Sequence, residues 1–175
     1  SSFFIAYTAI LFQGSIVERI GFNFSQAERM ITAMHTQLYI DGQWVDGVSK
    51  VAVYDPSDNS VITEVSMASD AQCEAAIAAA DAAAVAWAKT APRYRSEILR
   101  KAFEIMTSEI EAIATLISRE NGKAMPDARG EAAYAAEFFR WFAEEAVRTP
   151  GDFRKSPSGD KRILVTHQPI GLSIL

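Results

Sequence analysis

The sequence is poor in the residues that build covalent frameworks and metal sites. Its 175 residues include one cysteine, Cys73, and two histidines, His35 and His167. A single cysteine excludes an internal disulfide and is compatible with a reducing compartment. Cys73 has only Gln72 and Glu74 beside it, so no neighbouring base is available to activate a thiolate, and we interpret it as structural. The two histidines have no second ligand at suitable spacing, so no transition-metal site is expected.

Positive charge and long apolar runs are also scarce. The chain carries 17 Lys and Arg against 22 Asp and Glu, a formal net charge of -5. Nucleic acid and anionic membranes select basic surfaces, so neither is an expected partner. The apolar run Phe3 to Phe12 is shorter than the ~20 residues of a membrane-spanning helix and has no basic leader. These absences predict a cytoplasmic protein.

Two further observations limit the kinds of site and the number of domains that the sequence can encode. No glycine-rich phosphate loop follows any predicted strand, and the adjacent carboxylates Glu144 and Glu145 are interpreted as a solvated helix face. The content of 49% hydrophobic and 22% charged residues is ordinary for one globular domain or a piece of one. Residues 1–35 differ in composition from the rest, and we treat them as an uncertain N-terminal extension. Residues 36–175 form the organised region.

Short strands open and close this region. Asp41-Gly42 accepts the backbone geometry of a tight turn, which predicts a hairpin, and two further β-branched runs follow. These four predicted strands are residues 38–40, 43–45, 50–54 and 61–65. Near the end of the chain, a polar turn at residues 156–160 predicts a projecting hairpin. Leu172 to Leu175 is predicted to begin a buried strand, which would be the first strand of a truncated nucleotide-binding domain.

Three helices are predicted between Ser69 and Thr149, with breaks at residues 90–92 and 121–126. Ser69 and Gln72 have the spacing of a capping box at the first helix. Each helix has one apolar stripe at helical spacing. The stripes are Cys73, Ile77, Ala80, Ala84 and Trp87; then Leu99, Ala102, Met106, Ile110, Ile113 and Ile117; then Tyr134, Phe138, Trp141 and Phe142. The fold class is therefore α/β, with an antiparallel β lead-in, a three-helix block, a β-hairpin and one further strand.

Four short segments of the sequence, in their content, order and spacing, resemble the N-terminal part of the NAD(P)-dependent aldehyde dehydrogenase superfamily. Residues 128–146 are most similar to its succinate-semialdehyde dehydrogenase branch. The four segments are residues 38–44, the turn at Asp55-Pro56, residues 119–123 and residues 168–171.

The resemblance implies an enzyme that oxidises a small aldehyde, here succinic semialdehyde, with NAD or NADP. In this family a cysteine thiolate attacks the aldehyde, hydride passes to the cofactor and a glutamate activates water. The matching segments for these groups would follow Leu175, so no catalytic or cofactor-binding residue is assigned in this chain. The fragment itself is expected to be inactive and to bind no cofactor. By the same resemblance the parent enzyme is a homo-oligomer that uses the projecting hairpin for its contacts.

Two sites are implied by the resemblance. The third helix lines the family's substrate tunnel, which makes Tyr134, Phe138 and Trp141 candidates; the alternative is that these aromatic residues belong to the helix core. Family members also hold a structural monovalent cation, and the matching positions are Val53, Tyr54 and Glu120. The family's acid is often aspartate, and a capping or surface role for Glu120 stays open. A different class of function, a non-catalytic helical protein-interaction module, is also compatible with the sequence.

Overall fold

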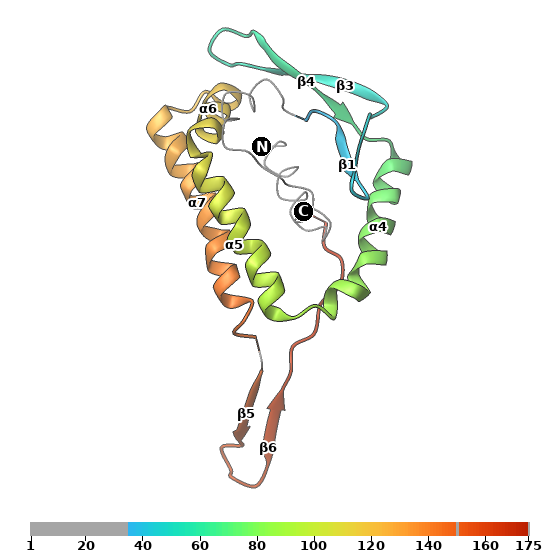
Figure 1. Cartoon of the computed structure of the whole chain (residues 1–175), viewed down its shortest axis with the longest axis vertical. Helices are drawn as coiled ribbons and strands as arrows, with labels where there is room; N and C mark the ends of the chain where they lie inside the picture. The colour runs from blue at the N-terminus through green and yellow to red at the C-terminus, as the bar shows by residue number, and fades with distance from the viewer. Residues whose placement is uncertain (1–34, 150, 175) are drawn as a thin grey trace.

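The computed structural model describes residues 35–149 and 151–174, and Figure 1 shows how their helices and strands are arranged. In chain order the elements are β1 (Leu38–Ile40), β2 (Gln43–Val45), β3 (Ser49–Tyr54), β4 (Val61–Met67), α4 (Asp70–Ala88), α5 (Pro92–Ser108), α6 (Ile110–Asn121), α7 (Met125–Glu145), β5 (Asp152–Lys155) and β6 (Arg162–Val165). The predicted α/β composition and the antiparallel lead-in are confirmed.

The described strands pair as three separate antiparallel hairpins, β1–β2, β3–β4 and β5–β6. In the first, Leu38 pairs with Val45 across a turn in which Asp41 and Gly42 both have positive φ, as the Asp-Gly signal predicts. The second has a register shift between Val53 and Tyr54. The third projects away from the helices (Figure 1), as the sequence predicts.

The core lies between α5, α6 and α7. Figure 1 shows α5 and α7 running side by side, and Met106 of α5 packs against Ala135 and Ala136 of α7. Short alanine side chains let the two helices approach closely, so the packing depends on their small size. At the rim, Arg129 of α7 makes a two-pronged ion pair with Glu111 of α6, with Nε–Oε1 at 2.8 Å and Nη2–Oε2 at 2.9 Å.

The predicted second helix is in fact two helices, α5 and α6, which are separated at Glu109. Glu109 has φ -110° and ψ 16°, and its N–H is shared between the carbonyl groups of Ile105 and Met106. The apolar stripe continues across this break, so periodicity alone gave no sign of it. The predicted end of the helix is confirmed, because Gly122 adopts the left-handed conformation (φ 73°).

The capping box of α4 is confirmed, and its predicted apolar stripe is not buried within the described residues. Gln72 N–H donates to Ser69 Oγ at 3.2 Å, and Ser69 N–H donates to Gln72 Oε1 at 3.0 Å. No residue of α4 is buried, and Ile77 is 41% exposed. The physical reason is that, among the described elements, α4 packs mainly against one short strand, β1. Figure 1 shows α4 standing apart from α5 and α7.

The last described residues form no strand. Residues 171–174 have no strand partner within the described part of the chain, and Ile174 is 79% exposed. The prediction of a strand beginning at Leu172 is therefore wrong for these residues. A buried strand needs a neighbouring strand to satisfy its backbone groups, and none lies alongside here.

Candidate functional site

The strongest candidate site is an aromatic face on α7, formed by Tyr134, Phe138, Trp141 and Phe142. These side chains are 67%, 47%, 60% and 53% exposed. Tyr134 meets Phe138 edge to face at 4.9 Å between ring centroids, and Phe138 lies parallel to Phe142 at 6.5 Å. Large apolar rings gathered on an exposed surface are typical of a binding or docking face.

The helix presents this face outward because its other face is made of alanine. The buried residues of α7 are Ala128, Ala132, Ala135, Ala136 and Ala143. At 3.6 residues per turn the alanines fall on the side that meets α5 and α6, and the rings fall away from it. Within the described residues, the aromatic side chains are therefore not part of the core between the helices. Alanines supply the fully buried positions of α7, and larger side chains, Met106, Phe103, Ile113 and Phe139, pack around them.

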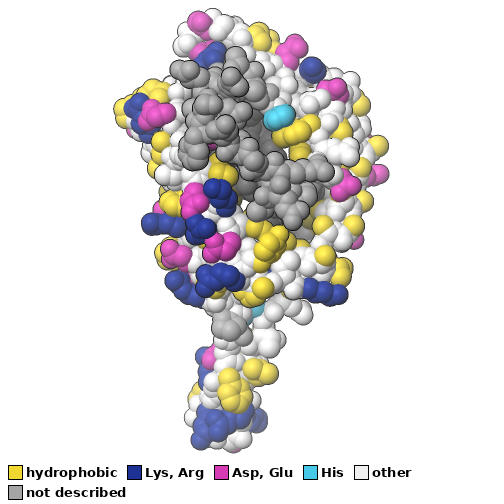
Figure 2. Space-filling model, in the orientation of Figure 1, with side chains coloured by type: hydrophobic (Ala, Val, Ile, Leu, Met, Phe, Trp, Pro, Cys, Tyr) yellow, Lys and Arg dark blue, Asp and Glu magenta, His cyan; other side chains and the backbone are white. Residues whose placement is uncertain are grey.

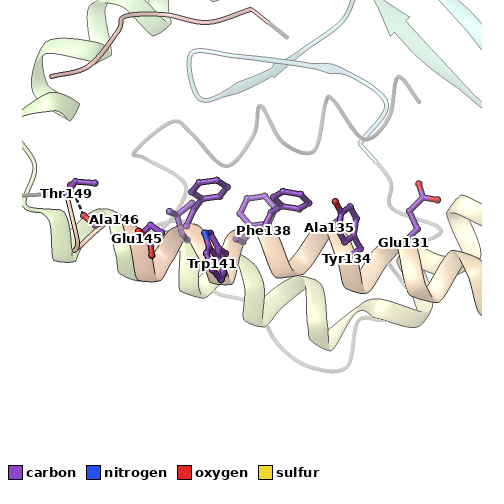
Figure 3. A pocket seen from close by; sticks show the side chains of 11 residues that line it. Glu131, Tyr134, Ala135, Phe138, Trp141, Glu145, Ala146 and Thr149 are labelled. Atoms are coloured by element: carbon purple, nitrogen blue, oxygen red, sulfur yellow. Dashed lines mark hydrogen bonds between the residues drawn. The ribbon is translucent and has the colours of Figure 1, made fainter. Parts of the chain in front are cut away.

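A groove of about 1150 Å³ runs along this face. Figure 3 shows Tyr134, Phe138 and Trp141 in a row along α7, with Glu131 toward one end and Glu145 toward the other. Leu99 and Phe139 complete its apolar wall, while Ala146 and Thr149 close the far end. An elongated apolar groove with few polar groups suits the carbon chain of a small substrate.

Both acidic residues of the groove have a basic partner. Glu145 Oε1 lies 2.7 Å from Arg148 Nη1, and Glu131 forms an ion pair with Lys123. The charge at each end of the groove is therefore locally balanced. Its aromatic middle is its distinguishing feature.

The candidate cation site lies where the C-terminal end of α6 meets the turn after β3. Arg119 Nε is 3.7 Å from Asp55 Oδ2 across this contact. A Cβ atom added to Gly122 would stand only 3.0 Å from Pro56 Cγ, so the backbone at the end of α6 lies close to the turn. The fold therefore brings the end of α6 to the end of β3.

These two elements carry the three predicted cation ligands, Val53, Tyr54 and Glu120. Glu120 Oε1 is buried and has no hydrogen-bond partner among the described residues. Removal from solvent raises the pKa of the Glu120 carboxyl above its ordinary value. A buried oxygen without a donor fits a hard monovalent cation, which takes oxygen ligands. The cation site remains a prediction, and a cation bound there would favour the ionised carboxylate.

The histidine and cysteine residues take no part in either candidate site. His35 stacks on Trp44, with ring centroids 4.0 Å apart and an angle of 5° between the ring planes. Cys73 is a free, exposed thiol on α4. Within residues 35–149 and 151–174, no group of three or more His, Cys, Asp or Glu is placed to hold a metal ion. None of the described helices has the length and hydropathy needed to cross a membrane.

The projecting hairpin differs in charge from the rest of the chain. Figure 2 shows Lys and Arg gathered at its tip, whereas acidic and basic side chains are mixed on the visible face of the body. The basic residues are Arg154, Lys155, Lys161 and Arg162. Phe153 is 66% exposed, and the Arg162 guanidinium lies 5.9 Å from the centroid of its ring. The hairpin therefore presents an exposed, basic and partly aromatic surface.

Comparison with known proteins identifies the family. The sequence profile of the aldehyde dehydrogenase family matches residues 44–175, and the chain belongs to this family. It is 46% identical over 115 residues to a succinate-semialdehyde dehydrogenase of Paenarthrobacter nicotinovorans, covering 66% of this chain and 26% of the relative. It is 41% identical over 139 residues to a glutarate-semialdehyde dehydrogenase of Pseudomonas putida, covering 78% and 29%.

Solved structures agree in fold. A succinate-semialdehyde dehydrogenase from Burkholderia pseudomallei superposes with a TM-score of 0.70 at 36% identity, over 77% of this chain and 28% of that one. The enzyme PnpE, solved in complex with nicotinamide adenine dinucleotide, superposes with a TM-score of 0.66 at 33% identity, over 72% and 26%. The chain thus spans between a quarter and a third of the length of these relatives.

Proposed function

We propose that this chain is the N-terminal part of a longer enzyme that oxidises succinic semialdehyde to the acid with NAD⁺ or NADP⁺. In the balanced reaction, the aldehyde and water give the carboxylic acid, and a hydride reduces the cofactor with release of a proton. Membership of the aldehyde dehydrogenase family and the 46% identity over 115 residues to a succinate-semialdehyde dehydrogenase support this proposal. In the cell we place the enzyme in the cytoplasm, as a homo-oligomer.

The observation that carries the proposal is the outward-facing aromatic row on α7. An aldehyde with a short carbon chain needs an apolar wall that excludes water and holds the chain in line. Tyr134, Phe138 and Trp141 supply such a wall on a rigid helix, because the alanine face opposite them is locked against α5. Their role is to bind and orient the substrate, and no proton transfer is assigned to them.

The chemical step falls to residues outside this chain. The family's reaction needs a cysteine nucleophile and a glutamate base. Cys73 is exposed on α4, and no titratable partner lies within hydrogen-bond distance of it among the described residues. The cofactor, when bound to the whole enzyme, accepts the hydride. We propose that residues 44–175 contribute structure to that enzyme but contain neither its nucleophile nor its base.

The hairpin and the cation site have structural roles in this proposal. Among the described strands, β5 and β6 pair only with each other, and the free outer edges of this basic, exposed hairpin suit contact with another subunit. A monovalent cation held by the carbonyl groups of Val53 and Tyr54 and the carboxylate of Glu120 would tie α6 to β3. Both features stabilise the enzyme rather than take part in hydride transfer.

The test is steady-state kinetics on the enzyme made from the complete reading frame, with succinic semialdehyde as substrate. Trp141→Ala should lower kcat/KM by about tenfold or more, since a lost apolar contact of this size costs on the order of 1–3 kcal/mol. Val85→Ala, which removes an exposed apolar side chain from α4, should leave kcat/KM unchanged. Equal kcat/KM values for the Trp141→Ala variant and the native enzyme would show that α7 does not line the substrate site.

The second candidate function, a protein-interaction module, rests on the same exposed aromatic face and on the hairpin. It predicts a complete reading frame without a catalytic cysteine and a product that captures another protein through α7. Active enzyme from the complete reading frame would exclude it.

A further inference from the structure

We draw no further inference here: the strongest candidate, the exposed aromatic face of α7, already forms the proposed substrate wall, and nothing in the structure shows what else covers it.

Discussion

Glu109, like Glu120, has a buried carboxyl oxygen without a hydrogen-bond partner among the described residues. It stands at the break between α5 and α6, it is 8% exposed, and its Oε2 has no hydrogen-bond partner in the described part of the chain. Burial raises the pKa of this carboxyl above its ordinary value. At a pH between the ordinary pKa of the unfolded chain and the raised pKa of the folded chain, Glu109 binds more protons in the folded chain. This carboxyl therefore makes the free energy of unfolding fall as the pH rises through that range.

The change Glu109→Gln should therefore stabilise the chain at neutral pH, by about 1 kcal/mol, because a buried ionisable group without a partner is removed. The measurement is the urea midpoint at neutral pH and again below the ordinary glutamate pKa, where the gain should shrink. Glu74→Gln, an exposed change on α4, is the matched control and should be neutral. A loss of stability in Glu109→Gln at neutral pH would show that the carboxylate has a stabilising partner.

Aspartates shift stability in the opposite direction, in a lower pH range. Hydrogen bonds from Ser57 hold the pKa of Asp55 below its ordinary value, and Ser158 and Ser156 do the same for Asp160. These groups contribute stability above the ordinary aspartate pKa and lose it as the pH falls through their lowered values. The pH range in which these aspartates titrate lies below the range in which Glu109 titrates. The comparison of Glu109→Gln with the native chain therefore reports on the Glu109 carboxyl alone.

Among the elements, α7 shows most clearly how residue size directs packing. Ala132 is 1% exposed against the neighbouring helices, whereas Ala133, the next residue, is exposed. Enlarging Ala132 forces α7 away from its neighbours, while enlarging Ala133 adds a side chain in solvent.

Ala132→Leu should accordingly lower the free energy of unfolding by about 1–3 kcal/mol. Ala133→Leu, the same change one position along the same helix, should stay within about 0.5 kcal/mol of the native chain. Urea unfolding followed by circular dichroism compares the two. Similar losses in both variants would mean that the alanine face of α7 is not the packed one.

The elements with strong local signals could be predicted from the sequence. The Asp41-Gly42 turn, the capping box at Ser69 and the left-handed end at Gly122 each depend on neighbouring residues alone. The break at Glu109 could not be predicted, because the apolar period continues across it. The buried face of α7 could not be predicted either, because hydrophobic size points to the aromatic residues, whereas close helix packing selects the alanines.

The two candidate sites also combine features that the sequence predicts with features that only the structure shows. The aromatic row on α7 is visible in the sequence as a pattern, but only the structure shows that it faces outward. Glu120 was proposed from the resemblance, and its unpartnered buried oxygen depends on the contact of α6 with the turn after β3. That contact joins residues more than sixty positions apart, so no local pattern reports it.

At the scale of the whole molecule, the described elements share one core only in part. Helices α5, α6 and α7 pack together, whereas α4 has no buried residue and the β5–β6 hairpin stands in solvent. Much apolar surface is thus left exposed, including Val85, Leu164 and Ile170. Such surface is the expected state of a region whose partners belong to the rest of a larger enzyme.

The chain on its own should accordingly show no aldehyde-dependent reduction of NAD⁺ or NADP⁺, because it carries no assigned nucleophile, base or cofactor contact. Purified chain is incubated with succinic semialdehyde and each cofactor, and absorbance of the reduced cofactor is followed. The control is Cys73→Ala. Turnover above the blank that disappears in this variant would give Cys73 a catalytic role and overturn the assignment.

The central claim is that these residues belong to a longer aldehyde dehydrogenase, and the reading frame beyond the codon for Leu175 tests it most directly. The chain spans between a quarter and a third of its relatives, so most of the catalytic apparatus should be encoded there. Sequencing the source DNA should show the frame continuing and encoding the family's glutamate base and cysteine nucleophile. A stop codon directly after Leu175 would contradict the account.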